Sequence, residues 1–404
     1  MTSQVRSVIT EAMKASFPAT HVVTVDPDHI DDQILLDHVV PVLKGGDIVA
    51  LPTETVYGLA GNALDSNAIS KIFQAKGRPS DNPLIVHISN LEQLKQLIPE
   101  DAFPQPGSLT RKLCDRFWPG PMTILFPRNS NVPDNVTAGL DRVGIRMPSH
   151  PIAKRIIELS GIPLAAPSAN KSGRPSPTCA SHVLMDLGRK EPPTDEYKFE
   201  FGKGAGVGCI VDGGECSIGV ESTVINVKDF TVLRPGTVTL EQLKQIDDRF
   251  CLYSAVSKQF LKEKEQLTVE ESNSIDKPAT PGLKYTHYCP NAKVILFEYE
   301  QPWSKFQEKI DSYIDNLLNE DPNAKIGILR IHESFLNYRE DNPNLIFCKI
   351  GSTSQPDIVA RNLFASFRYF DNENVNTIIM EGMSEDNEGL AVMNRARKAA
   401  TTIL

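Results

Sequence analysis

Between residues 76 and 84 the chain reads Lys76-Gly77-Arg78-Pro79-Ser80-Asp81-Asn82-Pro83-Leu84. The residues before this stretch, 67–76, carry apolar side chains at helical spacing, and Gly77 together with the two prolines ends that helix. The apolar residues 84–88 predict a strand. Lys76 and Arg78 therefore lie at a stiffened helix-to-strand corner, where two cations can bind an anion at little further cost in entropy. The alternative is a solvated turn whose cations hold no ligand.

Several other predicted strands end in hydroxyl groups or a cation beside glycine or proline. The buried strand predicted at 46–51, for example, runs into two threonines, a glutamate and a tyrosine. Open α/β sheets bind ligands at such strand ends, so the recurrence predicts one shared polar pocket. The segments that show it are Pro52–Leu59, Ser168–Pro177, Gly219–Ile225 and Val232–Gly236.

These segments resemble the YrdC-type family of threonylcarbamoyl-AMP synthases, in its long two-domain form. The resemblance is dense over residues 30–290 and loose beyond them. It implies an α/β fold with a YrdC-like twisted mixed sheet and helices in the N-terminal domain, and a smaller Rossmann-like α/β C-terminal domain. The motifs that carry it are Pro52–Leu59, Lys76–His87, Trp118–Pro121, Val143–Pro148, Ala166–Asn170, Gly219–Thr223, Leu233–Gly236 and Pro281–Tyr288.

The chain divides into three regions, which we expect to be a catalytic domain at 1–254, a polar linker at 255–290 and a second α/β domain at 291–404. Residues 191–208, rich in Pro, Gly and charge, predict a surface insertion. The resemblance implies that the linker crosses the mouth of the active site. The C-terminal region shows no catalytic constellation, which favours a docking, lid or regulatory role. Its predicted strands are 293–298, 325–330, 345–350 and 377–381, and its predicted helices are 303–318, 357–369 and 389–401.

The composition excludes several classes of protein. The chain holds 42 Lys and Arg against 51 Asp and Glu, a formal charge of −9, whereas proteins that coat nucleic acid are usually basic. No G-x-x-x-x-G-K-[ST] loop occurs, which argues against a P-loop NTPase. Seven cysteines without C-x-x-C spacing predict reduced thiols in the cytoplasm. No run is apolar enough for a membrane span or a secretory signal, and a mitochondrial fraction is left open.

The resemblance implies a nucleotidyltransferase that converts L-threonine, bicarbonate or CO2, and ATP into L-threonylcarbamoyladenylate and pyrophosphate. The product would pass to a tRNA threonylcarbamoyl transferase complex, which modifies an adenosine of tRNA. Such chemistry needs two anions held together and their charge offset rather than a protein nucleophile. Mg²⁺ is expected as a cofactor held mainly by the ATP phosphates, with no metal ligand assigned to the protein.

The resemblance also implies a role for individual residues. Lys76 and Arg78 are expected to be catalytic, because they would offset phosphate charge as it develops. Asn170 is expected to hold the shape of its loop. The predicted L-threonine contacts are Thr55, His87, Arg146, Ala166 and Ser222, and the predicted ATP contacts are Arg78, Asn82, Arg142, Ser168, Ser176, Arg234 and Tyr285.

Each assignment has a purely structural alternative. A lone histidine on a strand face, such as His87, is often structural, and Arg146 could form an ion pair with an acidic side chain instead of binding a carboxylate. The Ser222 hydroxyl could face solvent. Lys171 and Arg174 are expected to be solvated loop charges that lie near enough to the phosphates to assist in binding them.

Two other functions remain in view. One is a non-enzymatic RNA-binding maturation factor that uses the same concave surface, although the net acidity and the scarcity of basic–aromatic clusters argue against more than weak RNA binding. The other is a carbamoyl-transfer enzyme with a related adenylate and another acceptor. Contacts that read a methyl group and a carboxylate would separate that enzyme from a threonine-specific one.

Overall fold

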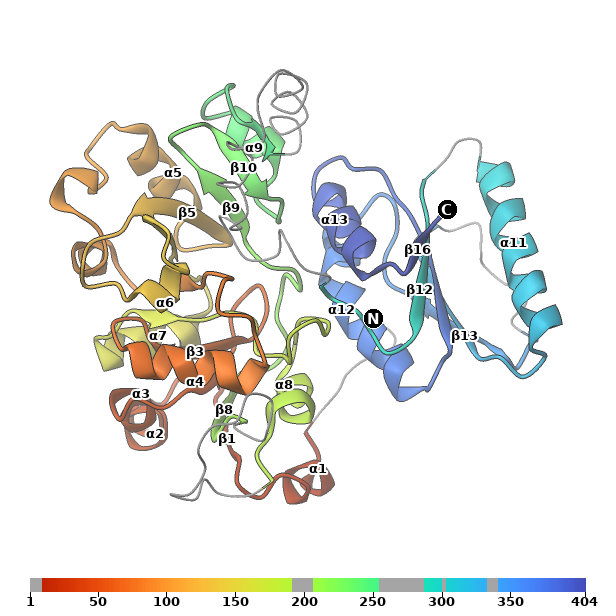
Figure 1. The fold of residues 1–404 in the computed structure, drawn as a ribbon, viewed down its shortest axis with the longest axis horizontal. Helices are drawn as coiled ribbons and strands as arrows, with labels where there is room; N and C mark the ends of the chain where they lie inside the picture. Colours follow the sequence, from red (N-terminus) through yellow and green to blue (C-terminus); the bar gives the residue numbers. More distant parts are fainter. Residues whose placement is uncertain (1–8, 191–205, 254–286, 300–302, 333–340) are drawn as a thin grey trace, which may run out of the picture.

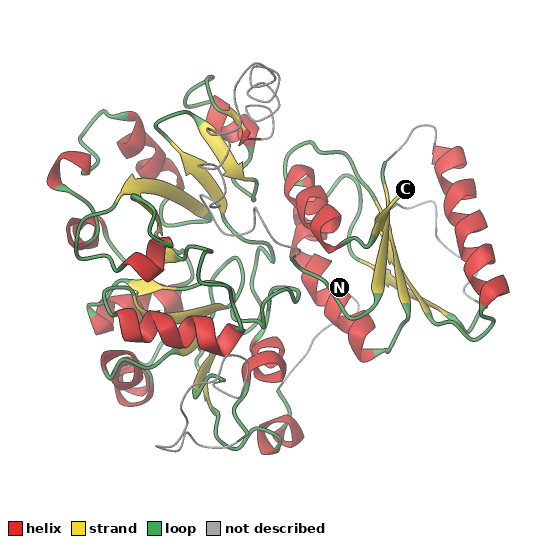
Figure 2. Cartoon of the chain, viewed as in Figure 1, coloured by secondary structure: helices red, strands yellow, loops and turns green. Residues whose placement is uncertain are grey.

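The computed structural model describes residues 9–190, 206–253, 287–299, 303–332 and 341–404. These residues form two domains, each built on its own sheet (Figure 1). Helices surround both sheets, as Figure 2 shows by secondary structure. The predicted α/β class is therefore confirmed, with a mixed sheet in the larger domain and a parallel sheet in the smaller one.

The larger domain is organised around a mixed sheet in which the described residues form eleven strands. Near its centre β4 and β6 are parallel, so that His87 lies opposite Arg146 at the carboxyl ends of both strands. The strands, in spatial order, are β1 His21–Thr24, β8 Cys209–Asp212, β2 Val49–Leu51, β3 Gly58–Asn62, β7 Leu164–Ala165, β4 Ile85–His87, β6 Arg142–Arg146, β5 Met122–Pro127, β9 Thr223–Asn226, β10 Thr231–Arg234 and β11 Cys251–Leu252.

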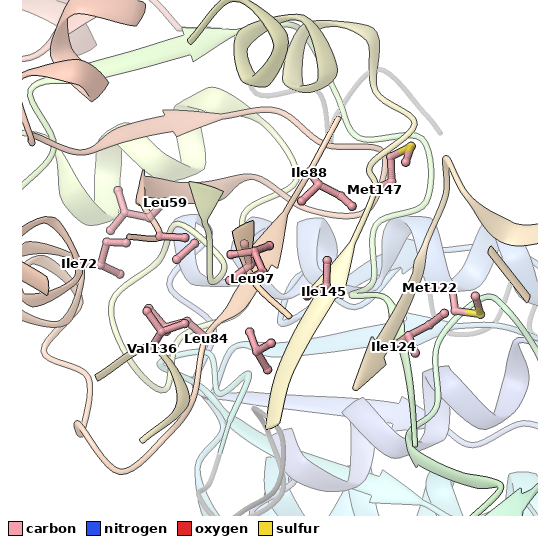
Figure 3. Close-up of a cluster of buried hydrophobic side chains, with 14 of the residues drawn as sticks. Leu59, Ile72, Leu84, Ile88, Leu97, Met122, Ile124, Val136, Ile145 and Met147 are labelled. Carbon is pink, nitrogen blue, oxygen red and sulfur yellow. The ribbon is translucent and has the colours of Figure 1, made fainter. Parts of the chain in front are cut away.

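Apolar clusters cover both faces of this sheet. Strand β2 contributes to both clusters, because successive side chains of a strand point to opposite faces of the sheet. Ala50 belongs to one cluster, and Val49 and Leu51 belong to the other. Figure 3 shows the first cluster, with Ile72 of α4 among the side chains around Leu59. The helices of this domain are α1 Glu11–Ala15, α2 Asp32–His38, α3 Val40–Lys44, α4 Ser66–Lys76, α5 Leu109–Phe117, α6 Asp134–Thr137, α7 Pro151–Ser160, α8 Ala180–Leu187 and α9 Leu240–Lys244, with short 3-10 helices at Leu91–Gln96 and Glu100–Ala102.

The corner between α4 and β4 has the predicted form. The carboxylate of Asp65 caps the start of α4, and Gly77 ends it in the left-handed region at φ +60°. Lys76 lies on the same buried face as Ile69 and Ile72, because residues three and four apart share one side of a helix. The apolar face of the helix thus carries an amine into the interior.

The smaller domain is a parallel sheet between helices. Helices α12 and α13 cover the face toward the larger domain, and α11 covers the far face (Figure 1). The strand order β14-β13-β15-β12-β16 differs from the 3-2-1-4-5-6 order of a dinucleotide-binding sheet. The elements are β12 Lys293–Phe297, α11 Trp303–Glu320, β13 Ile326–Arg330, β14 Leu345–Lys349, α12 Pro356–Asn372, β15 Thr377–Glu381, α13 Gly389–Ala399 and β16 Thr402–Ile403.

The predicted elements of this domain agree with the structure to within a few residues at their ends. The exception is β16, which sequence analysis missed because two residues carry too little pattern to predict a strand. An apolar cluster joins the two domains, since Val56 and Val220 pack together with residues of α12 and α13.

Several sequence predictions fall wholly or largely outside the described residues. Most of the predicted insertion at 191–208 and of the linker at 255–290 lies there, so the three domain boundaries stay predictions. None of the described helices combines the length and the apolar character that a membrane span requires. The seven cysteines all lie within the described residues and are free thiols.

The end of α4 generates a stability prediction. We expect Gly77→Ala to lower the free energy of unfolding by about 1 kcal/mol, because a Cβ is disfavoured at positive φ. The structure offers open space around a Cβ at this position, so the cost lies in the backbone alone. Denaturant titration followed by circular dichroism measures it.

Gly77→Asn is the matched control, because asparagine tolerates the left-handed region and should cost less than alanine. Equal losses for the two variants would show that the conformation of Gly77 does not set the cost.

Candidate functional site

One pocket opens where the strand ends of the larger domain meet the smaller domain. Its lining residues come from segments that lie far apart in the sequence. Four buried cations line it, namely Lys76, Arg78, Arg146 and Arg234. The other lining residues are Thr53, Thr55, Val56, Gly58, Ile85, His87, Ala166, Pro167, Ser168, Asn170, Ser172, Gly173, Arg174, Ser176, Glu221, Ser222, His287 and Tyr288.

Lys76 joins the helix corner to the neighbouring loop. Its Nζ donates hydrogen bonds to the carbonyls of Ser168 and of Asn170, the latter at 2.7 Å. Burial, and then the charge of Arg78, lower the pKa of the Lys76 amine well below its ordinary value. Asn170 holds the same loop through its side-chain amide, which donates to the carbonyls of Lys171 and Arg174, and its predicted role in loop shape is confirmed.

Arg78 faces the pocket from the stiff segment that follows Gly77. Its Nε and Nη2 donate to the carbonyls of Asn82 and Pro83 at 3.4 and 3.2 Å. Burial lowers the pKa of the guanidinium to about 10, so Arg78 stays charged near neutral pH. The carbonyls of Asn82 and Pro83 thus orient a permanently charged side chain toward the pocket.

Arg146 and Thr55 form a directed chain of hydrogen bonds. Arg146 Nη1 donates to Thr55 Oγ1 at 2.9 Å, and Thr53 Oγ1 lies 2.9 Å from Thr55 Oγ1. Because the Thr53 hydroxyl donates its one proton to the Val56 carbonyl, the Thr55 hydroxyl must donate to Thr53. The orientation of both threonines is therefore set by the backbone.

Arg146 also forms the ion pair that sequence analysis held open as its alternative. Its Nη2 lies 3.0 Å from Glu54 Oε2, and both side chains are almost fully buried. The pair is not aligned as a hydrogen bond, and Arg146 Nη2 and both oxygens of Glu54 have no hydrogen-bond partner among the described residues. Arg146 thus lines the pocket as a cation whose charge Glu54 partly offsets.

His87 is a neutral imidazole. Burial, and then the charge of Arg146, lower its pKa to about 3. Its Nδ1 lies 3.3 Å from the carbonyl of Ile85. A neutral imidazole has one donor and one acceptor nitrogen.

The opposite wall is built around Arg234 and Ser222. Arg234 Nε and Nη2 donate to the Ser222 carbonyl at 3.1 and 3.0 Å, and Nη2 also reaches the Ser222 hydroxyl at 3.2 Å. That hydroxyl lies 2.8 Å from Thr123 Oγ1. Ser222 is 1 % exposed, so its predicted alternative, a hydroxyl facing solvent, is wrong.

Glu221 was assigned no role from the sequence, although it lies within a quoted motif. Its Oε1 accepts from Ser176 Oγ at 2.5 Å and its Oε2 from Arg395 Nε at 3.1 Å. Burial raises the pKa of this carboxyl, but Arg395 and then Arg234 overcome that effect and leave it below its ordinary value. A glutamate between valine and serine predicts a buried charged partner, but the sequence does not show that this partner is Arg395.

The beginning of the described smaller domain reaches the pocket through His287 and Tyr288. Burial, and then the charge of Arg78, lower the pKa of His287 to about 4. Burial, and then Glu221, raise the pKa of Tyr288 to about 12. The Tyr288 ring packs 5.0 Å from that of Phe364 in α12, so the last residues of the predicted linker lie against both domains.

Two of the predicted contacts lie away from the pocket wall, and a third falls outside the described residues. Asn82 is buried but is not part of the pocket wall formed by the described residues. Arg142 lies at the far end of β6, about 13 Å along the strand from Arg146, and donates to Asn226 Oδ1 at 3.3 Å. Tyr285 lies outside the described residues.

The prediction that Arg174 is a solvated loop charge is wrong. Arg174 lines the pocket and pairs with Asp371 of α12 at 2.7 Å, because the smaller domain covers its loop. Lys171 is exposed, as predicted. The sequence of the loop alone could not distinguish the two cations.

The arrangement offers two kinds of binding chemistry side by side. Permanent guanidinium groups and hydroxyls suit a polyanion such as a nucleotide triphosphate. Next to them, Arg146, Thr55 and a neutral His87 supply a charged donor, a hydroxyl and an acceptor, which suits a small zwitterion. Among the described residues no group of three His, Cys, Asp or Glu is placed to hold a metal ion.

Comparison with known proteins identifies the family. Residues 41–236 match the Sua5/YciO/YrdC family, described as "Telomere recombination", and residues 238–401 match the threonylcarbamoyl-AMP synthase C-terminal domain. The threonylcarbamoyl-AMP synthase of Pyrococcus abyssi is 42% identical over 89% of this chain and 92% of its own length, and that of Bacillus subtilis is 40% identical over 89% and 90%.

A solved structure agrees with these relatives. The crystal structure of P. abyssi Sua5 complexed with L-threonine covers 95% of this chain and 100% of its own, at 39% identity and a TM-score of 0.76. The similarity extends through both domains. This chain therefore belongs to the threonylcarbamoyl-AMP synthase family, in its two-domain form.

Proposed function

We propose that this protein is an L-threonylcarbamoyladenylate synthase, which uses L-threonine, bicarbonate or CO2, and ATP, and releases pyrophosphate. The observation that carries the proposal is the convergence of Thr55, Arg78, Ser168 and Arg234 on one pocket. These residues come from four separate segments of the chain, and the resemblance in sequence assigns them to the two substrates. Membership of the family supplies the reaction.

The chemistry requires positioning more than covalent catalysis. The threonine amine adds to CO2 to give a carbamate, and a carbamate oxygen attacks the α-phosphorus of ATP. A phosphorus–oxygen bond forms while the bond to pyrophosphate breaks. Because both partners are anionic, the cations of the pocket must offset their repulsion and stabilise the charge that develops.

The threonine side of the pocket is supported by Arg146, Thr55 and His87. The guanidinium of Arg146, which lines the pocket, suits the carboxylate of the amino acid. The unprotonated nitrogen of the neutral His87 ring can accept a hydrogen bond from the amine or hydroxyl of threonine. Ala166 and Ser222 line the same pocket.

The nucleotide side is supported by Arg78, Arg234, Ser168 and Ser176. Arg78 is our choice for the charge nearest the reacting phosphate, since it stays protonated and is held rigidly. Lys76 contributes less directly, because two of its three N–H groups already hold the loop that carries Ser168.

Mg²⁺ is proposed as a cofactor that the ATP phosphates hold. Glu221, the carboxylate of the pocket wall, has both oxygens engaged by Ser176 and Arg395. The described residues thus do not form a protein cage for the ion. When bound to the nucleotide, Mg²⁺ would offset part of the triphosphate charge.

The adenylate would then be passed to a tRNA threonylcarbamoyl transferase complex. We place this reaction in the cytoplasm, which the free thiols support, and leave a mitochondrial fraction open. The alternative function as an RNA-binding factor is less well supported, because the chain is acidic.

The first prediction from this proposal is an omission series. Purified protein should release pyrophosphate from ATP only when L-threonine and bicarbonate are both present, because the attacking carbamate needs both. A coupled pyrophosphate assay in CO2-depleted buffer measures the dependence. Equal turnover without threonine would reject the proposal, and turnover with another acceptor alone would support the rival carbamoyl-transfer enzyme.

The second prediction concerns Arg146. Arg146→Ala should raise KM for threonine by roughly 30-fold, the equivalent of about 2 kcal/mol for a lost buried charge pair, while KM for ATP changes much less. Initial rates with each substrate varied in turn give both values. For Arg146→Lys, KM for threonine should lie between the values of the original protein and of Arg146→Ala, because lysine keeps the charge but lacks the planar, forked donors of a guanidinium.

Arg155→Ala is the control for loss of an arginine. Arg155 lies on the surface of α7, outside the pocket, and pairs with Asp32 of α2, so its loss should leave both KM values nearly unchanged. A larger effect of Arg146→Ala on ATP than on threonine would misplace the amino-acid site.

A further inference from the structure

Arginine side chains of the smaller domain reach into the walls of the pocket. Arg395 of α13 is fully buried and contacts two adjacent segments of the larger domain. Its Nε donates to Glu221 Oε2 at 3.1 Å, its Nη2 to the Glu221 carbonyl at 3.2 Å, and its Nη1 to the Pro235 carbonyl. Arg395 thus contacts the residue before Ser222 and the residue after Arg234.

The two segments that Arg395 contacts are themselves in close contact. Arg234 holds the Ser222 carbonyl, and a Cβ at Gly236 would lie 2.4 Å from the Thr223 nitrogen. There is therefore no room for the segments to shift independently. A displacement of Glu221 would carry Ser222 and Arg234 with it.

Glu221 connects Arg395 to the nucleotide side of the pocket. Its other oxygen accepts from Ser176, a predicted phosphate contact, so one carboxylate lies between a pocket hydroxyl and an arginine of the other domain. The carboxylate itself lines the pocket. Without a partner it would present a negative charge to an anionic ligand.

A second arginine of the smaller domain supports the same loop. Arg368 of α12 pairs with Asp186 at 2.7 Å and donates to the carbonyl of Pro175, next to Ser176. Arg174 pairs with Asp371 of the smaller domain, and Ser176 donates to Glu221, which Arg395 contacts. Each residue of the loop 174–176 is therefore held by the smaller domain, either directly or through Glu221.

We propose that Arg395 is a positioning residue for the nucleotide, which acts across the domain boundary by neutralising and orienting Glu221. Its guanidinium removes the repulsion that Glu221 would exert on the phosphates and holds Ser176, Ser222 and Arg234 in place. The smaller domain is then a structural part of the nucleotide site rather than an appended module. This inference rests on the proposed function for the identity of the ligand.

The proposal predicts a specific coupling between two substitutions. Arg395→Met should weaken ATP binding by roughly 10-fold or more, because it removes the ion pair that offsets most of the Glu221 charge beside the phosphates. Adding Glu221→Gln to Arg395→Met should restore most of the lost affinity, since an amide keeps the size of the side chain and lacks the charge. Arg395→Lys should lose less ATP affinity than Arg395→Met, because lysine keeps the positive charge beside Glu221.

Two measurements separate positioning from general damage. Calorimetric titration of the full chain with ATP, without threonine, gives affinity independent of turnover, and steady-state assays give KM for each substrate. We expect KM for ATP to rise more than KM for threonine. Thermal unfolding of each variant shows whether the fold is intact.

Arg397→Met is the matched control. Arg397 lies two residues away on α13, but it pairs with Glu298 and Glu385 inside the smaller domain. Its replacement removes an arginine and two ion pairs without touching the domain boundary, so ATP affinity should stay within about twofold of the original.

The outcomes distinguish this inference from the proposed function. If the original protein releases no pyrophosphate with all substrates present, the proposed function fails. If it is active and folded Arg395→Met binds ATP normally, or if Glu221→Gln brings no recovery, the inference alone fails. An equal rise in both KM values would likewise reduce Arg395 to a structural role.

Discussion

Buried positive charge gathered at one end of a sheet is the constraint on which this structure depends. Lys76, Arg78, Arg146 and Arg234 line one pocket and are each at most 6 % exposed. Like charges in a low-dielectric interior repel, and each has lost its hydration. The fold compensates with backbone carbonyls around Lys76 and Arg78, with Glu54 beside Arg146, and with the Ser222 carbonyl and Glu221 near Arg234.

That compensation is incomplete in a way that suits an anionic ligand. Neutral carbonyls orient the cations but leave their charge available, whereas carboxylates at every position would have neutralised it. Glu221 is the carboxylate of the pocket wall, and it is engaged by an arginine from outside the wall. The electrostatics of the pocket in the larger domain are thus completed by a residue of the smaller one.

The local features of the fold could be predicted from the sequence because neighbouring residues produce them. Helix α4, its end at Gly77 and the alternation that separates Val86 from His87 follow from spacing and from glycine and proline chemistry. The short strand β16 could not be found, because it exists only through its pairing with β12. Likewise the motif around β6 does not show which end of the strand faces the pocket, and Arg142 lies at the opposite end of β6 from Arg146.

Polar groups at strand ends are visible in the amino-acid sequence alone, and the resemblance of these segments to a family named the two substrates. Which of these groups meet depends on how the whole chain packs. Glu221 and Arg395 are 174 positions apart, and no local pattern records that one neutralises the other. The physical reason is that helical and strand periodicity arise from neighbouring residues, whereas the compensation of a buried charge depends on whichever side chain the packing of two domains brings within hydrogen-bond distance.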